Sequence, residues 1–447
     1  LTVASCYRFE SDQSAACQAS AVPGTLASTY RVDDGDYPGP YYRFLHLFVG
    51  PDIDHSVLVM RTVNVAIAAL VYGAALMLVP DRQRRIVVTT VVATIVPTTI
   101  SFVASINPSS WAITGVVGLW FACMALLGGM PRNRPAAITL LVVSAALAAT
   151  SRADAAAYVC VVTLAAAVLY LPTIRRSWRL LIPMGLAAAA GFWTFFSSGQ
   201  NDALAGITPP STDLDGFSLF ARNLMDLPGL LLGTFGVNYS LGWFDTALPA
   251  VGAFGGMLAV LVVMVVGLGQ MWRRKALAAL IVLGVAATLP MFVLQVNRVR
   301  IPADVQPRYV LPLIIVLVAV LAIGQTEFDA TRLSAAQAWI VWGLVNVTNV
   351  VSLHVQINRY TTGLDSQAIN PGANAEWWWE TGPSPMTVWL FGSAILAAWS
   401  YFVVVVNRPP VEVPIESLPI VTEPPPHVTP QSDPFPDPTG TETEENT

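Results

Sequence analysis

Long apolar runs recur along almost the whole of this chain and constrain its fold more than any other feature. An α-helix rises about 1.5 Å per residue and the hydrocarbon core of a bilayer is about 30 Å thick, so each crossing needs about 20 apolar residues. The runs predict an all-α, polytopic bundle of transmembrane helices. About eleven spans are expected, at 56–80, 86–105, 111–129, 136–150, 155–172, 180–197, 247–270, 276–296, 309–324, 338–357 and 386–406. The runs 136–150 and 155–172 form either one broken helix or two spans that meet at an interface.

The composition excludes the main classes of soluble protein. Of the 447 residues, 54% are hydrophobic and only 11% are charged, and the mean hydropathy is +0.59. An ordinary soluble domain has roughly 25% charged residues, so this chain cannot cover its own surface in water. The net charge of −5 offers no basic field for nucleic acid. A soluble enzyme, a nucleic-acid binder, a disulfide scaffold and a disordered protein are therefore all disfavoured.

Basic residues fall in alternate loops, and this pattern predicts the orientation in the plasma membrane. Short cytoplasmic loops collect Lys and Arg. The residues concerned are Arg82, Arg84, Arg85, Arg132, Arg134, Arg175, Arg176, Arg179, Arg273, Arg274, Lys275, Arg332 and Arg408. Segment 1–55 and loops 198–246, 297–308 and 358–385 are then external. Because the chain begins at Leu1 with its N-terminus outside, we expect that a signal-anchor helix upstream of Leu1 is missing.

Three segments follow from this topology. Residues 1–55 form an external segment, 56–406 form the transmembrane domain, and 407–447 form a cytoplasmic tail. The tail is rich in Pro, Asp, Glu and Thr, a composition typical of disorder. It is interpreted as a solvated tail, with docking of a partner as the alternative.

The cysteines indicate a disulfide rather than a metal site. Cys6 and Cys17 lie in the external segment, where an oxidising compartment favours a bridge over free thiols. Cys123 and Cys160 lie inside spans and are interpreted as small apolar residues. The four histidines are scattered, so no zinc site is predicted. Glycine-rich phosphate loops are absent from the sequence, which disfavours transport driven by a nucleotide.

The loop 297–308 breaks the charge rule, because it is external by topology yet carries Arg298, Arg300 and Arg308. Guanidinium groups at the level of the headgroups suit bidentate binding of phosphate. The alternatives are snorkelling to lipid headgroups or pairing with Asp304.

An external acidic cluster is the second candidate. Asp33, Asp34 and Asp36 precede the aromatic stretch 37–42, and a carboxylate in this place suits a general base toward an alcohol or sugar acceptor. The alternative is a solvated turn.

Further polar groups lie at the outer ends of spans. Asn107 occupies a tight external turn, Arg152 and Asp154 can pair across another, and Asp245 stands at the mouth of a span. Arg61 is the main charge inside a span. The stretch 217–232 is amphipathic and is expected to lie in the membrane interface. Since the middle of the bundle is nearly uncharged, proton-coupled transporters and ion pumps are disfavoured.

Several of these patches occur together in one family. The motifs are Cys6-Tyr-Arg-Phe9 with Ala16-Cys17, Tyr37-Pro-Gly-Pro-Tyr-Tyr42, Arg61, Ala104-Ser-Ile-Asn-Pro108, Ser151-Arg152, Gly242-Trp-Phe-Asp-Thr246 and Gln306-Pro-Arg-Tyr-Val-Leu-Pro312. In this order they resemble the actinobacterial domain-of-unknown-function family 2142, an uncharacterised membrane family. The resemblance covers nearly the whole chain except the tail.

That family is itself similar to GT-C glycosyltransferases, which take a sugar from a polyprenyl-phosphate carrier. The resemblance implies an external active site with a carboxylate base and with basic residues that hold the lipid phosphate. The motif residues Tyr41 and Tyr309 would contact substrate beside them. Family members usually carry a first span followed by a Pro-Asp-Glu-type stretch with a nearby His. This chain has neither, so Asp33, Asp34 and Asp36 substitute for the base.

The leading hypothesis is a GT-C-type glycosyltransferase that transfers a sugar from a polyprenyl-phosphate donor to an envelope glycan or glycolipid. Arg298, Arg300 and Arg308 would bind the donor phosphate, and Arg152 and Asp154 would shape the site. The sequence assigns no cofactor, and a divalent cation remains open. The alternatives are a transporter or flippase for lipid-linked sugars and a scaffold for envelope assembly.

Overall fold

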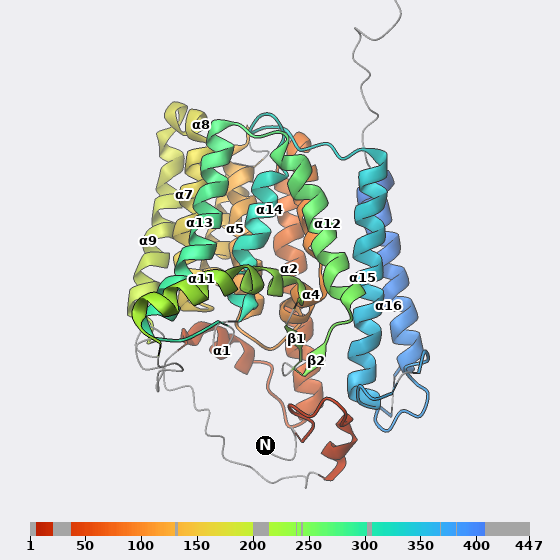
Figure 1. Ribbon diagram of the computed structural model, residues 1–447. Coiled ribbons are helices and arrows are strands. Elements are labelled where there is room, and N and C mark those ends of the chain that lie inside the picture. Colours follow the sequence, from red (N-terminus) through yellow and green to blue (C-terminus); the bar gives the residue numbers. More distant parts are fainter. Residues whose placement is uncertain are drawn as a thin grey trace, which may run out of the picture. The chain divides into compact units, whose positions relative to one another are not determined.

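The computed structural model is an all-α helical bundle with one two-stranded hairpin among the residues it describes (Figure 1). These residues are 6–20, 37–129, 133–199, 214–237, 239–242, 245–301, 306–366, 368–380 and 382–406. One compact unit comprises Leu1–Asn407. The expected tail at 407–447 lies outside the described residues, as does the acidic cluster Asp33, Asp34 and Asp36.

Seven described helices are long and apolar enough to cross a membrane. They are α2 (Ile53–Leu78), α5 (Ser109–Leu127), α9 (Leu181–Ser197, extended by the 3-10 turn η3, Trp178–Leu180), α12 (Ala250–Leu268), α13 (Arg273–Val296), α15 (Ala335–Thr361) and α16 (Pro385–Ser400, extended by the π-helical turn η6, Tyr401–Val406). Each coincides with a span expected from hydropathy. The all-α membrane bundle predicted from the sequence is therefore confirmed.

The expected span 86–105 is not one straight helix. It consists of α3 (Arg84–Thr94) and α4 (Pro97–Val103), and the pair is bent by 98°. Proline has no backbone N–H, and it also disfavours helical geometry in the residue before it. Val96 accordingly adopts an extended conformation, with φ −82° and ψ 162°. The bend turns α4 toward the residues that precede α5.

The three expected spans that remain are shorter apolar helices. They are α6 (Arg134–Ala149), α7 (Ala153–Leu169) and α14 (Leu311–Leu321). The runs 136–150 and 155–172 thus form two separate helices, with the turn at Thr150–Arg152 between them. At 11 residues, α14 is only about 16 Å long and cannot cross a bilayer alone. All its residues are buried, so its surroundings are other helices rather than lipid.

Helix α5 is the centre of the bundle, and every one of its residues is buried. Two glycines allow its neighbours to approach closely. A Cβ atom at Gly115 would lie 2.4 Å from the backbone nitrogen of Ala148 in α6, and one at Gly118 would lie 2.4 Å from a side-chain atom of Val71 in α2. Small residues at such contacts are the usual means of tight helix packing in membranes.

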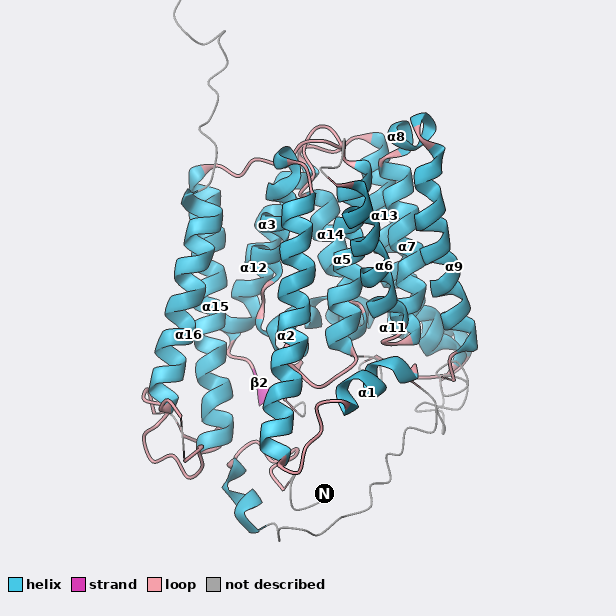
Figure 2. Ribbon diagram, turned by 180° about the vertical axis from the view of Figure 1, so that it is seen from behind, coloured by secondary structure: helices cyan, strands magenta, loops and turns pink. Residues whose placement is uncertain are grey.

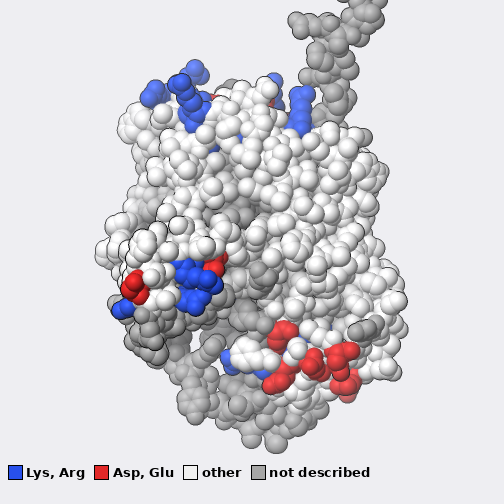
Figure 3. All heavy atoms as spheres, viewed as in Figure 1, with Lys and Arg blue, Asp and Glu red and all other residues white. Residues whose placement is uncertain are grey.

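The remaining elements are short, and several lie at one end of the bundle. They are η1 (Ala15–Ser20), α1 (Gly39–His46), η2 (Asp81–Gln83), α8 (Leu171–Arg176), α11 (Gly216–Leu232), η4 (Gly233–Phe235), the antiparallel pair β1 (Ser240–Leu241) and β2 (Thr246–Ala247), and η5 (Pro307–Tyr309). Figure 2 shows α1 and β2 near the same ends of the spans. The end of the bundle that carries α1 and α11 is called the α11 face below. Figure 3 shows basic side chains along the opposite edge of the molecule and a second group at the level of α11.

Candidate functional site

The α11 face contains an amphipathic helix that runs across the spans instead of along them (Figure 1). Asp215 caps it, because its side chain accepts a hydrogen bond from the backbone N–H of Ser218, and this bond lowers the pKa of Asp215. Phe217 and Met225 are 81% and 77% exposed, whereas Leu230 is buried. The helix thus buries one apolar side against the protein and leaves other apolar side chains exposed, which is the amphipathic pattern expected for stretch 217–232.

A single buried asparagine fixes α11 to the segment after α13. The Asn223 amide donates to the Val299 carbonyl at 2.9 Å, and its oxygen accepts from the Ile301 N–H at 2.9 Å. Arg298, which has a left-handed backbone with φ 54°, donates to the Leu214 carbonyl at 3.0 Å. The chain carrying Arg298 and Arg300 therefore lies along α11.

Aromatic residues fix α1 against the first turn of α5. Tyr41 is fully buried, and its ring packs edge-on against Trp111 with the ring centroids 5.1 Å apart. Asn64 of α2 connects them: its amide donates to the Tyr41 hydroxyl at 3.4 Å, and its oxygen accepts from the Trp111 indole at 3.1 Å. Burial raises the pKa of Tyr41. Tyr41 thus helps to hold α1 against α5, and its hydroxyl already accepts a hydrogen bond from Asn64.

Arg152 and Asp154 form an ion pair at the start of α7. Arg152 is 2% exposed, its Nε donates to Asp154 Oδ1 at 2.8 Å, and a second bond joins the other guanidinium and carboxylate atoms. The third guanidinium nitrogen donates to Ser109 Oγ at 2.6 Å. Burial alone would lower the pKa of Arg152, but the neighbouring carboxylate outweighs it, so this pKa is raised. Arg152 is therefore a fixed cation whose charge Asp154 neutralises.

Tyr309 brings Arg308 to this pair. The guanidinium carbon of Arg152 lies 4.4 Å from the centroid of the Tyr309 ring, and that of Arg308 lies 5.4 Å from the same ring. Arg308 also lies 5.6 Å from the ring of Phe102, at the end of α4. The backbone carbonyl of Tyr309 accepts from the Tyr158 hydroxyl at 3.1 Å, which ties η5 to α7. We call Ser109, Arg152, Asp154, Arg308 and Tyr309 the Arg152–Arg308 site.

The two arginines of this site differ in their partners. Among the residues that the structure describes, no carboxylate pairs with Arg308, and its buried Nε has no hydrogen-bond partner. The same charges act on the pKa of Tyr37, the first described residue before α1. Burial and Tyr309 raise the pKa of Tyr37, and Arg152 and Arg308 oppose this shift. The site therefore combines a neutralised arginine, an uncompensated arginine and aromatic rings.

The other candidates predicted from sequence lie elsewhere on the α11 face. Arg61 donates to the Ala104 carbonyl at 2.8 Å, and Asn107 accepts from the Ser109 N–H at 2.9 Å. Both order the 104–109 turn that precedes α5. Asp245 pairs with Arg359 at 2.7 Å, away from the Arg152–Arg308 site contacts. The structure thus brings Arg152, Asp154, Arg308 and Tyr309 together. Arg298 and Asp245 make other contacts, and Arg300 lies between Val299 and Ile301, whose backbones bond to Asn223 of α11.

Two residues of these networks were not foreseen. Ser109 holds Arg152, but a serine at a helix start is ordinarily a capping residue and carries no separate signal. Arg359 is an arginine in a loop expected to be external, which is the same exception to the charge rule that singled out 297–308. Within the described ranges, no group of three or more His, Cys, Asp or Glu side chains is arranged to hold a metal ion.

An all-α bundle with seven helices capable of spanning a bilayer and an in-plane amphipathic helix defines a polytopic membrane protein. Sequence comparison gives the family. The chain belongs to the family described as "Predicted membrane protein (DUF2142)", whose model matches residues 2–318. No curated protein and no solved structure matches the chain. The matched range includes the whole Arg152–Arg308 site and ends before α15 begins.

Proposed function

We propose that this chain is an integral membrane glycosyltransferase of the GT-C type. It would transfer a sugar from a polyprenyl-phosphate donor to a glycan or glycolipid acceptor of the cell envelope. The α11 face would be the outer face of the plasma membrane, and the C-terminal tail would be cytoplasmic. The observation that carries the proposal is the guanidinium of Arg308, which pairs with no carboxylate in the described part of the chain and is held against aromatic rings beside the neutralised Arg152.

The charge of the site suits a lipid phosphate. Arg152 and Asp154 cancel each other, so Arg308 contributes the net positive charge of the Arg152–Arg308 site. Phosphate accepts bidentate hydrogen bonds from a guanidinium, and a partly buried site strengthens them. The rings of Phe102 and Tyr309 supply an apolar surface for a polyprenyl chain. The exposed apolar side of α11 is suited to the interface where such a lipid enters.

The proposed reaction needs a base and a cation. The acceptor hydroxyl attacks the anomeric carbon, the bond from that carbon to the phosphate oxygen breaks, and polyprenyl phosphate leaves with an additional negative charge. Arg308 would stabilise this charge, which is greater in the transition state than in the bound donor. A carboxylate must accept the proton of the acceptor. We assign this role to the cluster Asp33, Asp34 and Asp36, because Asp36 directly precedes Tyr37, whose phenol senses Arg152 and Arg308.

Arg298 and Arg300 take a different role in this proposal. Since the segment that carries them lies along α11, they would contact lipid headgroups near the site entrance. Asp154 would keep Arg152 in place below Tyr309, so that Arg308 and not Arg152 meets the donor phosphate.

The proposal is tested by binding of undecaprenyl phosphate to the full chain in nanodiscs, with undecaprenol as the reference lipid that lacks phosphate. Loss of a charge-assisted bond costs about 1.5–3 kcal/mol, so Arg308→Ala should weaken binding of the phosphate lipid by about 10- to 150-fold. The affinity of Arg308→Lys for the phosphate lipid should lie between those of wild type and Arg308→Ala. Arg179 is exposed and is not part of the Arg152–Arg308 site, so Arg179→Ala should bind like wild type.

Radiolabelled polyprenyl-phosphate sugar then separates the functions. Label that appears covalently in an envelope acceptor, and is lost in Arg308→Ala, supports the transferase. Label that crosses the bilayer while still attached to its lipid would overturn it in favour of a flippase. Equal binding of the phosphate lipid by wild type and Arg308→Ala would contradict the assignment of the site.

A further inference from the structure

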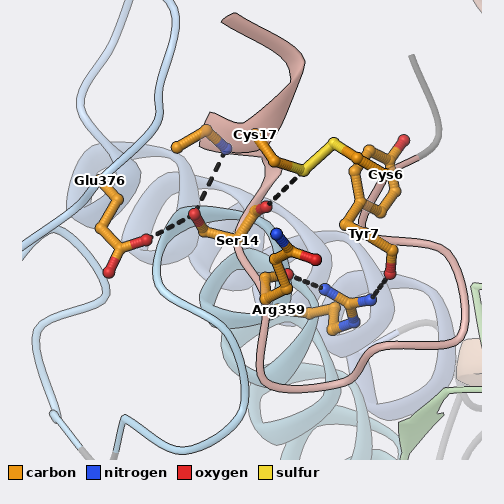
Figure 4. The surroundings of a disulfide bond; sticks show 8 residues. Cys6, Tyr7, Ser14, Cys17, Arg359 and Glu376 are labelled. Atoms are coloured by element: carbon orange, nitrogen blue, oxygen red, sulfur yellow. Dashed lines mark hydrogen bonds between the residues drawn. A yellow bond between two sulfur atoms is a disulfide. The ribbon is translucent and has the colours of Figure 1, made fainter. Parts of the chain in front are cut away.

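A small covalent loop lies against the end of α15. Cys6 and Cys17 are joined by a disulfide bond, with their Cα atoms 6.1 Å apart, and the bond closes the loop 6–17 (Figure 4). The loop ends inside η1, which contains Cys17 and also packs on α15. It therefore connects the beginning of the chain with a helix near its end.

The loop forms a cage for one buried guanidinium. Arg359, in the last turn of α15, is 1% exposed. Its two terminal nitrogens donate to the backbone carbonyls of Gln13 and Tyr7, each at 2.6 Å. Both carbonyls belong to the disulfide-closed loop, and the guanidinium also lies 5.7 Å from the centroid of the Tyr7 ring. Tyr7 in turn packs edge-on against Tyr360.

One carboxylate neutralises the caged cation and binds the loop as well. Asp245, at the turn before β2, accepts from Arg359 at 2.7 Å and is itself 5% exposed. The same oxygen accepts from the backbone N–H of Phe9 at 3.2 Å. The carboxylate and the two carbonyls satisfy both terminal nitrogens of Arg359, whereas its Nε has no hydrogen-bond partner among the described residues. Loss of any of these partners leaves more of the buried charge unsolvated.

Further bonds join the loop to the segment after α15. The Leu364 N–H donates to the Ser11 carbonyl at 3.0 Å, and the Ser14 hydroxyl donates to the Glu376 carboxylate at 2.6 Å. A Cβ at Gly363, whose φ is +87°, would lie 2.1 Å from the carbonyl oxygen of Asp12. The close approach of the two backbones at this point requires glycine.

We propose that the loop 6–17 is an oxidation-dependent clamp that holds the end of α15 and the following segment on the α11 face. Closed by the disulfide, the loop presents the carbonyls of Tyr7 and Gln13 at the spacing of one guanidinium. Opened, its residues gain the conformational freedom that the covalent link removes, and Arg359 loses its cage. Because the family model ends at residue 318, the clamp also attaches helices beyond the family match to the matched part.

Opening the clamp is a thiol–disulfide exchange. A dithiol such as dithiothreitol supplies two electrons and two protons: the sulfur–sulfur bond breaks, Cys6 and Cys17 become thiols, and the reagent becomes a cyclic disulfide. Closing is the reverse transfer to a disulfide oxidant of the compartment that the α11 face meets. Cys6–Cys17 is the bond that reduction opens, because the other two of the four cysteines, Cys123 and Cys160, are free thiols.

Trypsin tests the clamp in the full chain in nanodiscs, with cleavage after Arg359 as the readout. Arg359 is protected by burial in the oxidised protein. We expect cleavage after Arg359 to become about tenfold faster or more after dithiothreitol treatment and in the Cys6→Ser/Cys17→Ser variant. Cleavage after Arg152, which is equally buried, should stay slow and so reports an intact bundle. Cys160→Ser is the matched control and should behave as wild type before and after reduction.

Unchanged cleavage after Arg359 in the reduced wild type, with reduction verified by thiol alkylation, would overturn the proposal. Equal acceleration after Arg152 and Arg359 would also overturn it, because reduction would then unfold the whole bundle. If the double serine variant does not fold, reduction of the folded wild type still gives the answer. The clamp and the glycosyltransferase are tested by different variants, so failure of one leaves the other standing.

Discussion

Replacing Asp245 with alanine leaves the buried guanidinium of Arg359 without its carboxylate. The pair is separated by 2.7 Å, and the two side chains are 5% and 1% exposed. Removing one partner of a buried ion pair costs about 3–5 kcal/mol. Because Arg359 keeps the carbonyls of Tyr7 and Gln13, we expect a cost at or just below the lower end of this range, about 2–3 kcal/mol. The unfolding equilibrium should therefore shift by a factor of about 30 to 150.

The chain contains its own reporter for this measurement. Cys123 is fully buried in α5, so its thiol reacts with a maleimide dye only when the bundle opens. Denaturant titrations in detergent would compare wild type with Asp245→Ala and with the control Asp226→Ala. Asp226 pairs with Arg222 on the surface of α11, where such a pair contributes about 0.3–0.5 kcal/mol. If Asp245→Ala costs no more than Asp226→Ala, the buried pair has no special role and the reasoning is refuted.

Two further changes test the packing of the bundle and of α11. Gly115→Val places a side chain against the backbone of α6 and should destabilise the protein by at least about 3 kcal/mol, whereas Gly73→Val, where a Cβ meets nothing within 4 Å, should be near neutral in the same titration. Asn223→Ala removes two buried hydrogen bonds and should speed amide exchange at Ile301 by tenfold or more, about 1.4 kcal/mol or above. Similar effects of the two glycine variants, or unchanged exchange with Asn223→Ala, would contradict these packing arguments.

Hydropathy located the helices well because membrane spans need long apolar runs, and such runs are visible without knowledge of packing. The amphipathic period of 217–232 likewise located α11, because the spacing of its apolar residues is visible in the sequence. The break at Pro97 was present in the sequence as a proline within an apolar run, but apolarity alone does not give the 98° bend. Hydropathy also did not show that α14 has only 11 residues. A helix this short is stable here because all its residues are buried among other helices, which the sequence alone does not reveal.

The candidate site was harder to predict, because its residues converge only through helix packing. Arg152 and Arg308 come from the starts of α7 and α14, and a single sequence does not say that these helix ends meet over one tyrosine ring. From the sequence alone, Arg308 and Arg298 were equivalent candidates for phosphate binding, and Asp245 was grouped with the substrate-binding residues. Burial and hydrogen-bond partners make these distinctions: Arg298 bonds to the backbone before α11, and Asp245 neutralises Arg359.

The central claim is that Arg308 binds the phosphate of a polyprenyl-phosphate lipid on the α11 face. Its most direct test is a cryo-EM map of the full chain in nanodiscs that contain undecaprenyl phosphate. The account predicts density for the phosphate within hydrogen-bond distance of the Arg308 guanidinium, with the Arg152–Asp154 pair intact beside Tyr309. Phosphate density elsewhere on the protein, with nothing added at Arg308, would contradict it.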